Sequence, residues 1–198
     1  MVATSTELGA LALRHGLARK RYNALAAVLS GGIPAALFAH YYPSTWAQWL
    51  LGLAVGLLWG NGFEYAYHRW LLHLPGSSLG KGHLEHHASV GTPGEAEHVA
   101  LGRSPLYVAL LFASNGLVVV LIDFFFALHI LPGIFVGWVV YLVTAEEIHW
   151  RIHMNGWLPP SLRFARAYHM HHHDTPDSRY NVFMPIFDLM LGSCKPSR

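Results

Sequence analysis

Long apolar stretches with almost no charge constrain this chain more than any other feature of its sequence. The 45 residues from Ser104 to Ile148 contain no Lys or Arg, and their acids are Asp123, Glu146 and Glu147. A segment of about 20 mostly apolar residues is long enough to cross a bilayer as a helix. Charged residues make up 12% of the chain, about half the share that is typical of soluble domains. The sequence therefore predicts an all-α integral membrane protein.

Four helices are predicted to span the membrane. Their apolar parts cover residues 22–42, 45–62, 105–128 and 132–143. The second and the fourth are expected to continue as helices beyond their apolar parts, to His73 and His153, so that their last turns project into water. Residues 22–198 are therefore predicted to form one membrane domain.

The basic residues indicate how these spans are oriented. Lys and Arg precede the first span, lie between the second and the third, and follow the fourth, whereas the short loops near residues 42–45 and 128–133 contain neither. Because loops rich in Lys and Arg stay in the cytoplasm, both termini are expected on the cytoplasmic side of a bacterial inner membrane or of the endoplasmic reticulum. Residues 1–21 are expected to be a cytoplasmic segment, with an amphipathic helix over Leu8–Arg21 on the membrane surface. The net charge of +2 is too small to indicate nucleic-acid binding.

Ten of the fifteen histidines form four tight clusters beside the apolar segments. The clusters are His68 with His73, His83 with His86 and His87, His149 with His153, and His169 with His172 and His173. Pairs at i, i+4 and trios at i, i+3, i+4 place their rings on one face of a helix. The spacing of five residues between His68 and His73 separates them by about 140° in an α-helix. This pair is therefore expected either to serve two metals or to lie in a locally distorted helix.

Ten imidazoles are too many ligands for one ion and suit two, because neutral imidazole is the commonest side-chain metal ligand. The single cysteine, Cys194, excludes an intrachain disulfide and a cysteine-based zinc site. With the orientation above, all four clusters fall on the cytoplasmic side and are predicted to converge on one dinuclear metal site. Imidazole suits zinc, copper, iron and nickel, and such a site in a membrane protein indicates oxygen chemistry on a lipid.

The four clusters resemble the histidine boxes of the fatty acid hydroxylase and sterol desaturase superfamily of membrane di-iron enzymes. The boxes read HRWLLH (His68–His73), HLEHH (His83–His87), HWRIH (His149–His153) and YHMHHH (Tyr168–His173). The segment RYNVFMPIFDLMLGS (Arg179–Ser193) also resembles the closing segment of the family, although Met190 and Leu191 stand where larger aromatic residues are common. The resemblance covers residues 45–193, and four ordered boxes are far more specific than any one of them.

The resemblance implies that the ten clustered histidines hold two Fe ions, with O2 as co-substrate and electrons from a separate donor, a cytochrome, ferredoxin or reductase. Zinc is expected to replace iron in overproduced protein, because it binds such sites more tightly than Fe(II). The expected activity is hydroxylation of an unactivated C–H bond of a lipid drawn from the bilayer, with a fatty acyl chain as the first candidate.

Two alternative functions stay open. The first is hydroxylation or desaturation of a carotenoid or sterol, because the HRWLLH box and the small size are also similar to bacterial carotenoid hydroxylases. The second, from another class, is a non-enzymatic metal carrier or transporter. Transport predicts ionisable residues near the middle of the membrane, and the apolar spans contain almost none there.

Several polar residues are candidates for contacts behind the ligands. Glu64 lies four residues before His68, and Glu146 lies three residues before His149. Each is placed to accept the second ring N–H of a ligand, or instead to pair with a neighbouring arginine. Asp188 is favoured for the same role by its position in the family segment.

The remaining candidates follow from single positions. Asn181 is expected either to hold a metal-bound water or to cap a turn. His171 lies about 200° from His169 on an α-helix and is expected to face away from the ligands. Four isolated histidines are expected to be structural: His15, His40, His98 and His129.

Overall fold

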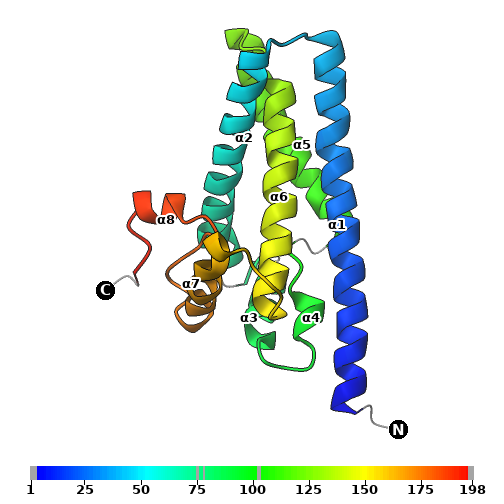
Figure 1. Cartoon of the computed structure of the whole chain (residues 1–198), viewed down its shortest axis with the longest axis vertical. Coiled ribbons are helices and arrows are strands. Elements are labelled where there is room, and N and C mark those ends of the chain that lie inside the picture. Colours follow the sequence, from blue (N-terminus) through cyan, green and yellow to red (C-terminus); the bar gives the residue numbers. More distant parts are fainter. Residues whose placement is uncertain (1–3, 75, 78, 102–103, 196–198) are drawn as a thin grey trace. The chain divides into compact units, whose positions relative to one another are not determined.

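The computed structural model describes residues 4–74, 76–77, 79–101 and 104–195, and every regular element in these ranges is a helix (Figure 1). The α-helices are α1 (Ser5–Tyr41), α2 (Trp46–Tyr67), α3 (Lys81–Ser89), α4 (Glu95–His98), α5 (Pro105–Phe126), α6 (Leu131–His153), α7 (Arg163–Asp174) and α8 (Ile186–Met190). A π-helix, His68–Leu72, follows α2, and a 3-10 turn, Pro160–Leu162, precedes α7. The predicted all-α class is confirmed. Arg103 and Arg198, two of the residues behind the predicted orientation, lie outside the described ranges.

The chain divides into two compact units. Unit 1 comprises the described residues of Met1–Lys20, Asn61–Arg103 and Ala145–Arg198, and unit 2 comprises Arg21–Gly60 and Ser104–Thr144. All four histidine clusters belong to unit 1, and the apolar parts of α5 and α6 belong to unit 2.

The N-terminal segment differs from its prediction. The expected surface helix over Leu8–Arg21 and the expected first span are parts of one continuous helix, α1, of 37 residues (Figure 1). The sequence around Arg21 contains no Gly or Pro to end a helix, and Ala, Leu, Arg and Lys, which dominate it, are the strongest helix formers. The helix therefore has no reason to stop where the charged residues end.

Three helices are long and apolar enough to cross a membrane by length and composition, namely α1, α5 and α6. Helix α2 has 22 residues, but Gln48, Asn61 and three tryptophans reduce its mean hydropathy. Three of the four predicted spans thus meet this criterion in the described part of the chain. The second predicted span, residues 45–62 in α2, and the cytoplasmic orientation stay predictions.

In unit 2, glycines allow α2 and α6 to pack with their backbones in close contact. A Cβ added to Gly56 would lie 2.5 Å from the carbonyl oxygen of Ile134, and one added to Gly133 would lie 2.3 Å from that of Trp49. Small residues at such contacts are typical of helices that pack within membranes. Beside this seam, Trp59 of α2 donates its indole N–H to Asn115 of α5 at 3.0 Å, so both polar groups are paired within unit 2.

The turn between α5 and α6 is fixed by an acid in the apolar part of the chain. Asp123 is 1% exposed, and its Oδ1 accepts the backbone N–H of Ile130 at 2.9 Å, directly before α6 begins. A carboxylate there satisfies a free N–H at a helix N-terminus and complements the helix dipole. This interaction explains why an acid is present within the long apolar run.

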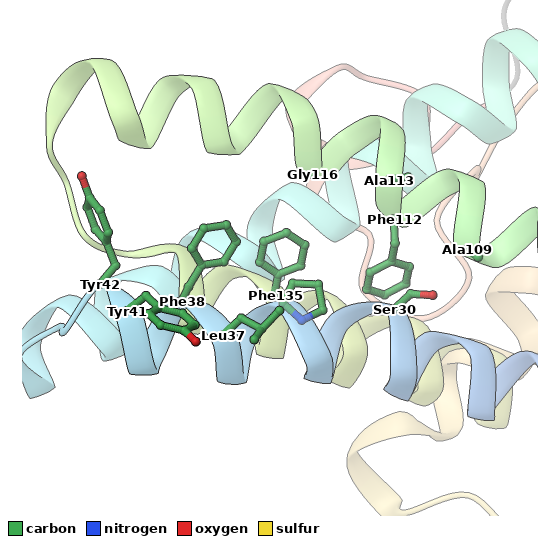
Figure 2. Close-up of a pocket in the computed structure, with 11 residues that line it drawn as sticks. Ser30, Leu37, Phe38, Tyr41, Tyr42, Ala109, Phe112, Ala113, Gly116 and Phe135 are labelled. Atoms are coloured by element: carbon green, nitrogen blue, oxygen red, sulfur yellow. The ribbon is translucent and has the colours of Figure 1, made fainter.

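Unit 2 also contains an apolar groove of about 640 Å³ between α1, α5 and α6. Phe38, Phe112 and Phe135 point into it, and Tyr41 and Tyr42 stand at one end (Figure 2). Pockets of this volume are large enough for small organic ligands.

In unit 1, the C-terminal segment is held by the buried carboxylate of Asp188. Its two oxygens accept the backbone N–H groups of Tyr180 at 3.0 Å and Asn181 at 2.8 Å, and Oδ1 also accepts the hydroxyl of Ser193 at 2.8 Å. The side-chain amide of Asn181 donates to the carbonyl of Asn61 at 3.0 Å. These bonds fix the loop over residues 178–181 against the C-terminal end of α2.

Candidate metal centre

The structure brings all ten clustered histidines together in two groups within unit 1. Each histidine offers one ring nitrogen, and within each group these nitrogens lie within 4.8 Å of one another. Group A consists of His68, His73, His83, His87 and His172. Group B consists of His86, His149, His153, His169 and His173. The groups are neighbours, because the rings of His87 and His173 have centroids 4.2 Å apart.

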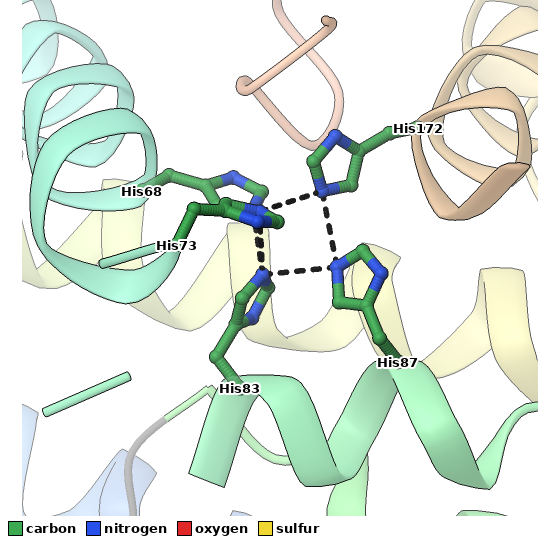
Figure 3. Close-up of side chains that lie close together, drawn as sticks. All are labelled: His68, His73, His83, His87 and His172. Atoms are coloured by element: carbon green, nitrogen blue, oxygen red, sulfur yellow. Dashed lines mark hydrogen bonds between the residues drawn. The ribbon is translucent and has the colours of Figure 1, made fainter. Parts of the chain in front are cut away.

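The nitrogens of group A have the spacing of ligands around one ion (Figure 3). The Nε2 atoms of His73, His83, His87 and His172 form a closed ring with sides of 3.0, 3.0, 3.2 and 3.2 Å. The Nε2 of His68 lies 2.9 Å from that of His83. Ligands at right angles, each about 2.1 Å from a metal, are separated by about 3.0 Å. The geometry therefore suits a five-nitrogen ligand set around one ion.

Group B has the same spacing around a more deeply buried centre. The Nε2 of His169 lies 2.9 Å from that of His149 and 3.1 Å from those of His153 and His173. Both ring nitrogens of His86 are buried and have no hydrogen-bond partner within the described chain. Buried polar groups are nearly always paired, so an unpartnered imidazole at this place fits the binding of a metal ion.

Bonds on the far side of the rings fix the direction of four of these imidazoles. In group A, the Nδ1–H of His68 donates to the carbonyl oxygen of Tyr180, and that of His172 donates to the carbonyl oxygen of Ser178 at 2.6 Å. In group B, the Nδ1–H of His149 donates to the carbonyl oxygen of Val99 at 2.9 Å. The Nδ1–H of His153 donates to a carboxylate oxygen of Glu95 at 2.9 Å. A neutral imidazole carries one proton, so the Nε2 atoms of these rings present lone pairs to the centre of each group. Lone pairs that converge at about 3 Å repel one another unless a cation lies between them.

The π-helix explains why His68 and His73 belong to the same group. Bonding from i to i+5 brings residues five apart onto one face, and the two rings stack with centroids 5.1 Å apart. Of the two expectations from the sequence, the locally distorted helix is confirmed. The structure does not divide the pair, because both rings belong to group A.

The two trios, in contrast, are each divided between the groups. In α3, His83 and His87 belong to group A and His86 belongs to group B. In α7, His172 belongs to group A, whereas His169 and His173 belong to group B. Adjacent sides of one helical stripe therefore face different groups, and α3 and α7 join the two groups.

Burial keeps the imidazoles in the state that a metal requires. Loss of contact with water lowers the pKa of His173 to about 2, of His87 to about 3 and of His172 to about 4. Repulsion between neighbouring rings adds to this effect, while the bond to the carbonyl of Ser178 opposes it at His172. A neutral ring keeps the lone pair that coordinates a cation, so these three side chains are ready to bind a metal at neutral pH.

The acids proposed as partners of the ligands have other contacts. Glu64 accepts the side-chain amide of Asn181 at 2.8 Å, and Glu146 accepts the backbone N–H of Leu101 at 3.2 Å. Asp188 was expected to contact a ligand directly, but it instead holds the loop whose carbonyl oxygens, those of Ser178 and Tyr180, contact the ligands. The amide of Asn181 takes part in the same loop.

One acid in contact with a candidate ligand escaped the sequence analysis. Glu95 lies 58 positions before His153 in the chain, and no local pattern links the two residues. The alternative partner proposed for Glu146, Arg151, donates to the neighbouring Glu147 at 2.6 Å. The histidines expected to be structural, and His171, belong to neither group. His129 instead stacks on Tyr42, and His40 contacts Tyr41 edge-on.

Comparison with known proteins is consistent with this geometry. A family model described as fatty acid hydroxylase matches residues 53–193. The chain is also similar to a solved structure described as full-length Scs7p with only the hydroxylase domain visible, at a TM-score of 0.60 and 21% identity. The match covers 84% of this chain and 61% of that one, so this chain spans less than two thirds of its length, and the likeness concerns the fold. No curated protein sequence matches the chain.

Proposed function

Because the chain belongs to the fatty acid hydroxylase family, we propose that it is a membrane oxygenase that hydroxylates an unactivated C–H bond of a fatty acyl chain. The observation that carries the proposal is the pair of neighbouring five-nitrogen groups, whose lone pairs converge at the distances that a metal ion requires. All-imidazole ligand sets suit iron. Two ions of iron, one in each group, are part of the proposal.

The reaction consumes one O2, two electrons and two protons, converts the C–H bond to C–OH and releases one water. When they are bound, the iron ions would provide the place where O2 is reduced. The electrons for this reduction come from a separate cytochrome, ferredoxin or reductase. The substrate chain is taken from the bilayer, and this part of the proposal rests on the apolar helices α1, α5 and α6.

The residues of the chain contribute position and exclusion of water. Tyr180 and Ser178 hold the rings of group A through their carbonyl oxygens, while Val99 and Glu95 hold two rings of group B. Ligands locked from behind keep their geometry while a substrate binds and leaves. His169 and His172 are at most 1% exposed, so water is excluded from the inner part of the site, which protects a reactive oxidant from side reactions.

Isotope labelling of the lipid pool tests this function directly. Cells that produce the protein are grown under 18O2, and their acyl lipids, carotenoids and sterols are compared by mass spectrometry with those of cells that lack it. We expect one labelled oxygen on fatty acyl chains, and none when His172→Ala replaces the wild type. His171→Ala is the matched control, because its ring belongs to neither group, and it should retain the product.

The other outcomes separate the alternatives. Label on a carotenoid or sterol, or a new double bond without label, would contradict hydroxylation of a fatty acyl chain. It would favour instead the alternative function, a carotenoid or sterol hydroxylase or a desaturase. A lipid pool unchanged by the wild-type protein would contradict the enzymatic function and leave metal transport as the better account.

A further inference from the structure

The two groups of histidines are supported from behind by different segments of unit 1. The rings of group A are held by the loop over residues 178–181, through backbone carbonyls. The rings of group B are held by the segment from Glu95 to Val99, which includes α4. The supports of the two groups therefore differ in position along the chain.

They also differ in charge. Three of the four acceptors behind the rings are neutral carbonyl oxygens, and the fourth is the carboxylate of Glu95. Its Oε1 lies 2.9 Å from Nδ1 of His153. The side chain of Glu95 is 14% exposed, and that of His153 is 0% exposed. Its other oxygen accepts the backbone N–H of Gly91 at 2.7 Å. Both oxygens are thus engaged, and the carboxylate is held in a fixed orientation toward the ring.

The N-terminal part of α1 fixes α4 in this place. Arg19 donates to the carbonyl oxygen of Glu97 at 2.8 Å, at the C-terminal end of α4. A Cβ on Gly16 would lie 2.0 Å from the carbonyl oxygen of Ala96, so α1 and α4 touch through their backbones. Ala12, Val99 and Trp150 complete a small core around the contact.

A carboxylate behind a ligating imidazole makes the ring a stronger donor than a carbonyl does, because negative charge at Nδ1–H increases the basicity of the opposite nitrogen. The effect is large where water does not screen it, as at a fully buried ring. Group B also has four buried members, whereas group A has two. The charge of Glu95 therefore favours tighter metal binding in group B, and the deeper burial of group B favours slower exchange of its ion.

We propose that Glu95 is a positioning residue that makes group B the tighter of two unequal metal sites. The proposal rests on the dinuclear centre of the proposed function. It predicts that the two ions differ in affinity and in rate of exchange, with the ion of group A leaving first.

Metal competition with zinc as the probe tests this inference. The purified chain, residues 1–198, is loaded with Zn²⁺ in detergent and titrated with a chromophoric chelator, and the zinc released is followed by absorbance. The wild type should release two zinc ions in two separate steps. In Glu95→Gln, which keeps the shape and the acceptor but removes the charge, the tighter step should weaken by about 10- to 100-fold, and the other step should not move.

Glu97→Gln is the matched control. It makes the same chemical change two residues away in the same helix, and the side chain of Glu97 faces His15 at 3.5 Å rather than a member of either group. Its release curve should match that of the wild type. Glu95→Asp keeps the negative charge and should retain two unequal steps, so the two Glu95 variants together separate the loss of charge from a change of side-chain shape.

The outcomes distinguish this inference from the proposed function. A wild type that binds two zinc ions, with Glu95→Gln unchanged or with both steps weakened equally, would overturn the role of Glu95 and leave the dinuclear centre intact. A wild type that binds fewer than two zinc ions would overturn both. Equal thermal stability of the zinc-free wild type and Glu95→Gln would support a role at the metal, whereas a large loss in the zinc-free variant would indicate a structural role and overturn the proposal.

Discussion

A pair of Gly→Ala substitutions tests the close packing of α2 against α6 within unit 2. Gly56 and Gly32 both lie inside helices, and alanine is the better helix former at either position by about 0.5–1 kcal/mol. They differ in what a new methyl group would meet. At Gly32 nothing lies within 4 Å, whereas at Gly56 the carbonyl oxygen of Ile134 would be 2.5 Å away and its Cα 2.9 Å away.

The expected effects have opposite signs. Gly32→Ala should raise the free energy of unfolding by about 0.5–1 kcal/mol, because only helix propensity changes. Gly56→Ala must push α2 and α6 apart, since the atoms it meets belong to backbone and not to a flexible side chain. Overpacking costs about 1–3 kcal/mol, and the upper end less the gain in propensity leaves a net loss of about 2 kcal/mol.

Unfolding by SDS in mixed micelles, followed by far-UV circular dichroism, measures both values in the same protein. The wild type is the reference, and Gly32→Ala controls for the change of glycine to alanine. If Gly56→Ala were as stable as Gly32→Ala, the backbone contact between α2 and α6 would be wrong.

Three further predictions concern the site and the topology. His173→Ala should lose a metal ion, whereas His171→Ala should keep both, and elemental analysis of the two variants gives the comparison; equal loss would place His171 among the ligands. In the metal-free protein, the pKa values of His87, His172 and His173, at about 3, 4 and 2, lie below the usual 6.5, so the unfolded chain takes up protons first as the pH falls. The thermal midpoint should therefore be level above about pH 7 and fall below about pH 6.5, and a midpoint that rose on acidification would refute this. A reporter fused after Arg198, or inserted at Ser78, should be cytoplasmic because of the one-sided Lys and Arg distribution, and an external reporter at either place would contradict the predicted orientation.

The helices and the members of the site follow closely from the sequence, because both depend on local patterns. Apolar length gives α5 and α6, whose observed starts at Pro105 and Leu131 lie within one residue of those expected. The spacings of the histidines mark all ten members of groups A and B. The expectation of a separate surface helix that ends at Arg21 was wrong, because α1 continues to Tyr41. A change from charged to apolar residues does not interrupt a backbone made of strong helix formers.

The division of the histidines between two groups depends on three-dimensional detail that spacing does not contain. An α-helical spacing places His83, His86 and His87 on one stripe of a helix, but it does not say whether the three rings belong to one group. The positions of α6 and the π-helix decide which ring faces which group. The contact between Glu95 and His153 joins segments 58 residues apart. Carbonyl acceptors such as those of Val99 and Ser178 have no sequence signal at all, because every residue has a carbonyl.

Anomalous X-ray diffraction from crystals of the metal-loaded protein tests the central claim most directly. Data collected on both sides of the absorption edge of iron or zinc locate each metal ion independently of any assumption about its ligands. We expect two peaks per chain, one surrounded by the ring nitrogens of His68, His73, His83, His87 and His172 and the other by those of His86, His149, His153, His169 and His173. A single peak, or a peak outside these two groups, would contradict the dinuclear centre on which the proposed hydroxylase function depends.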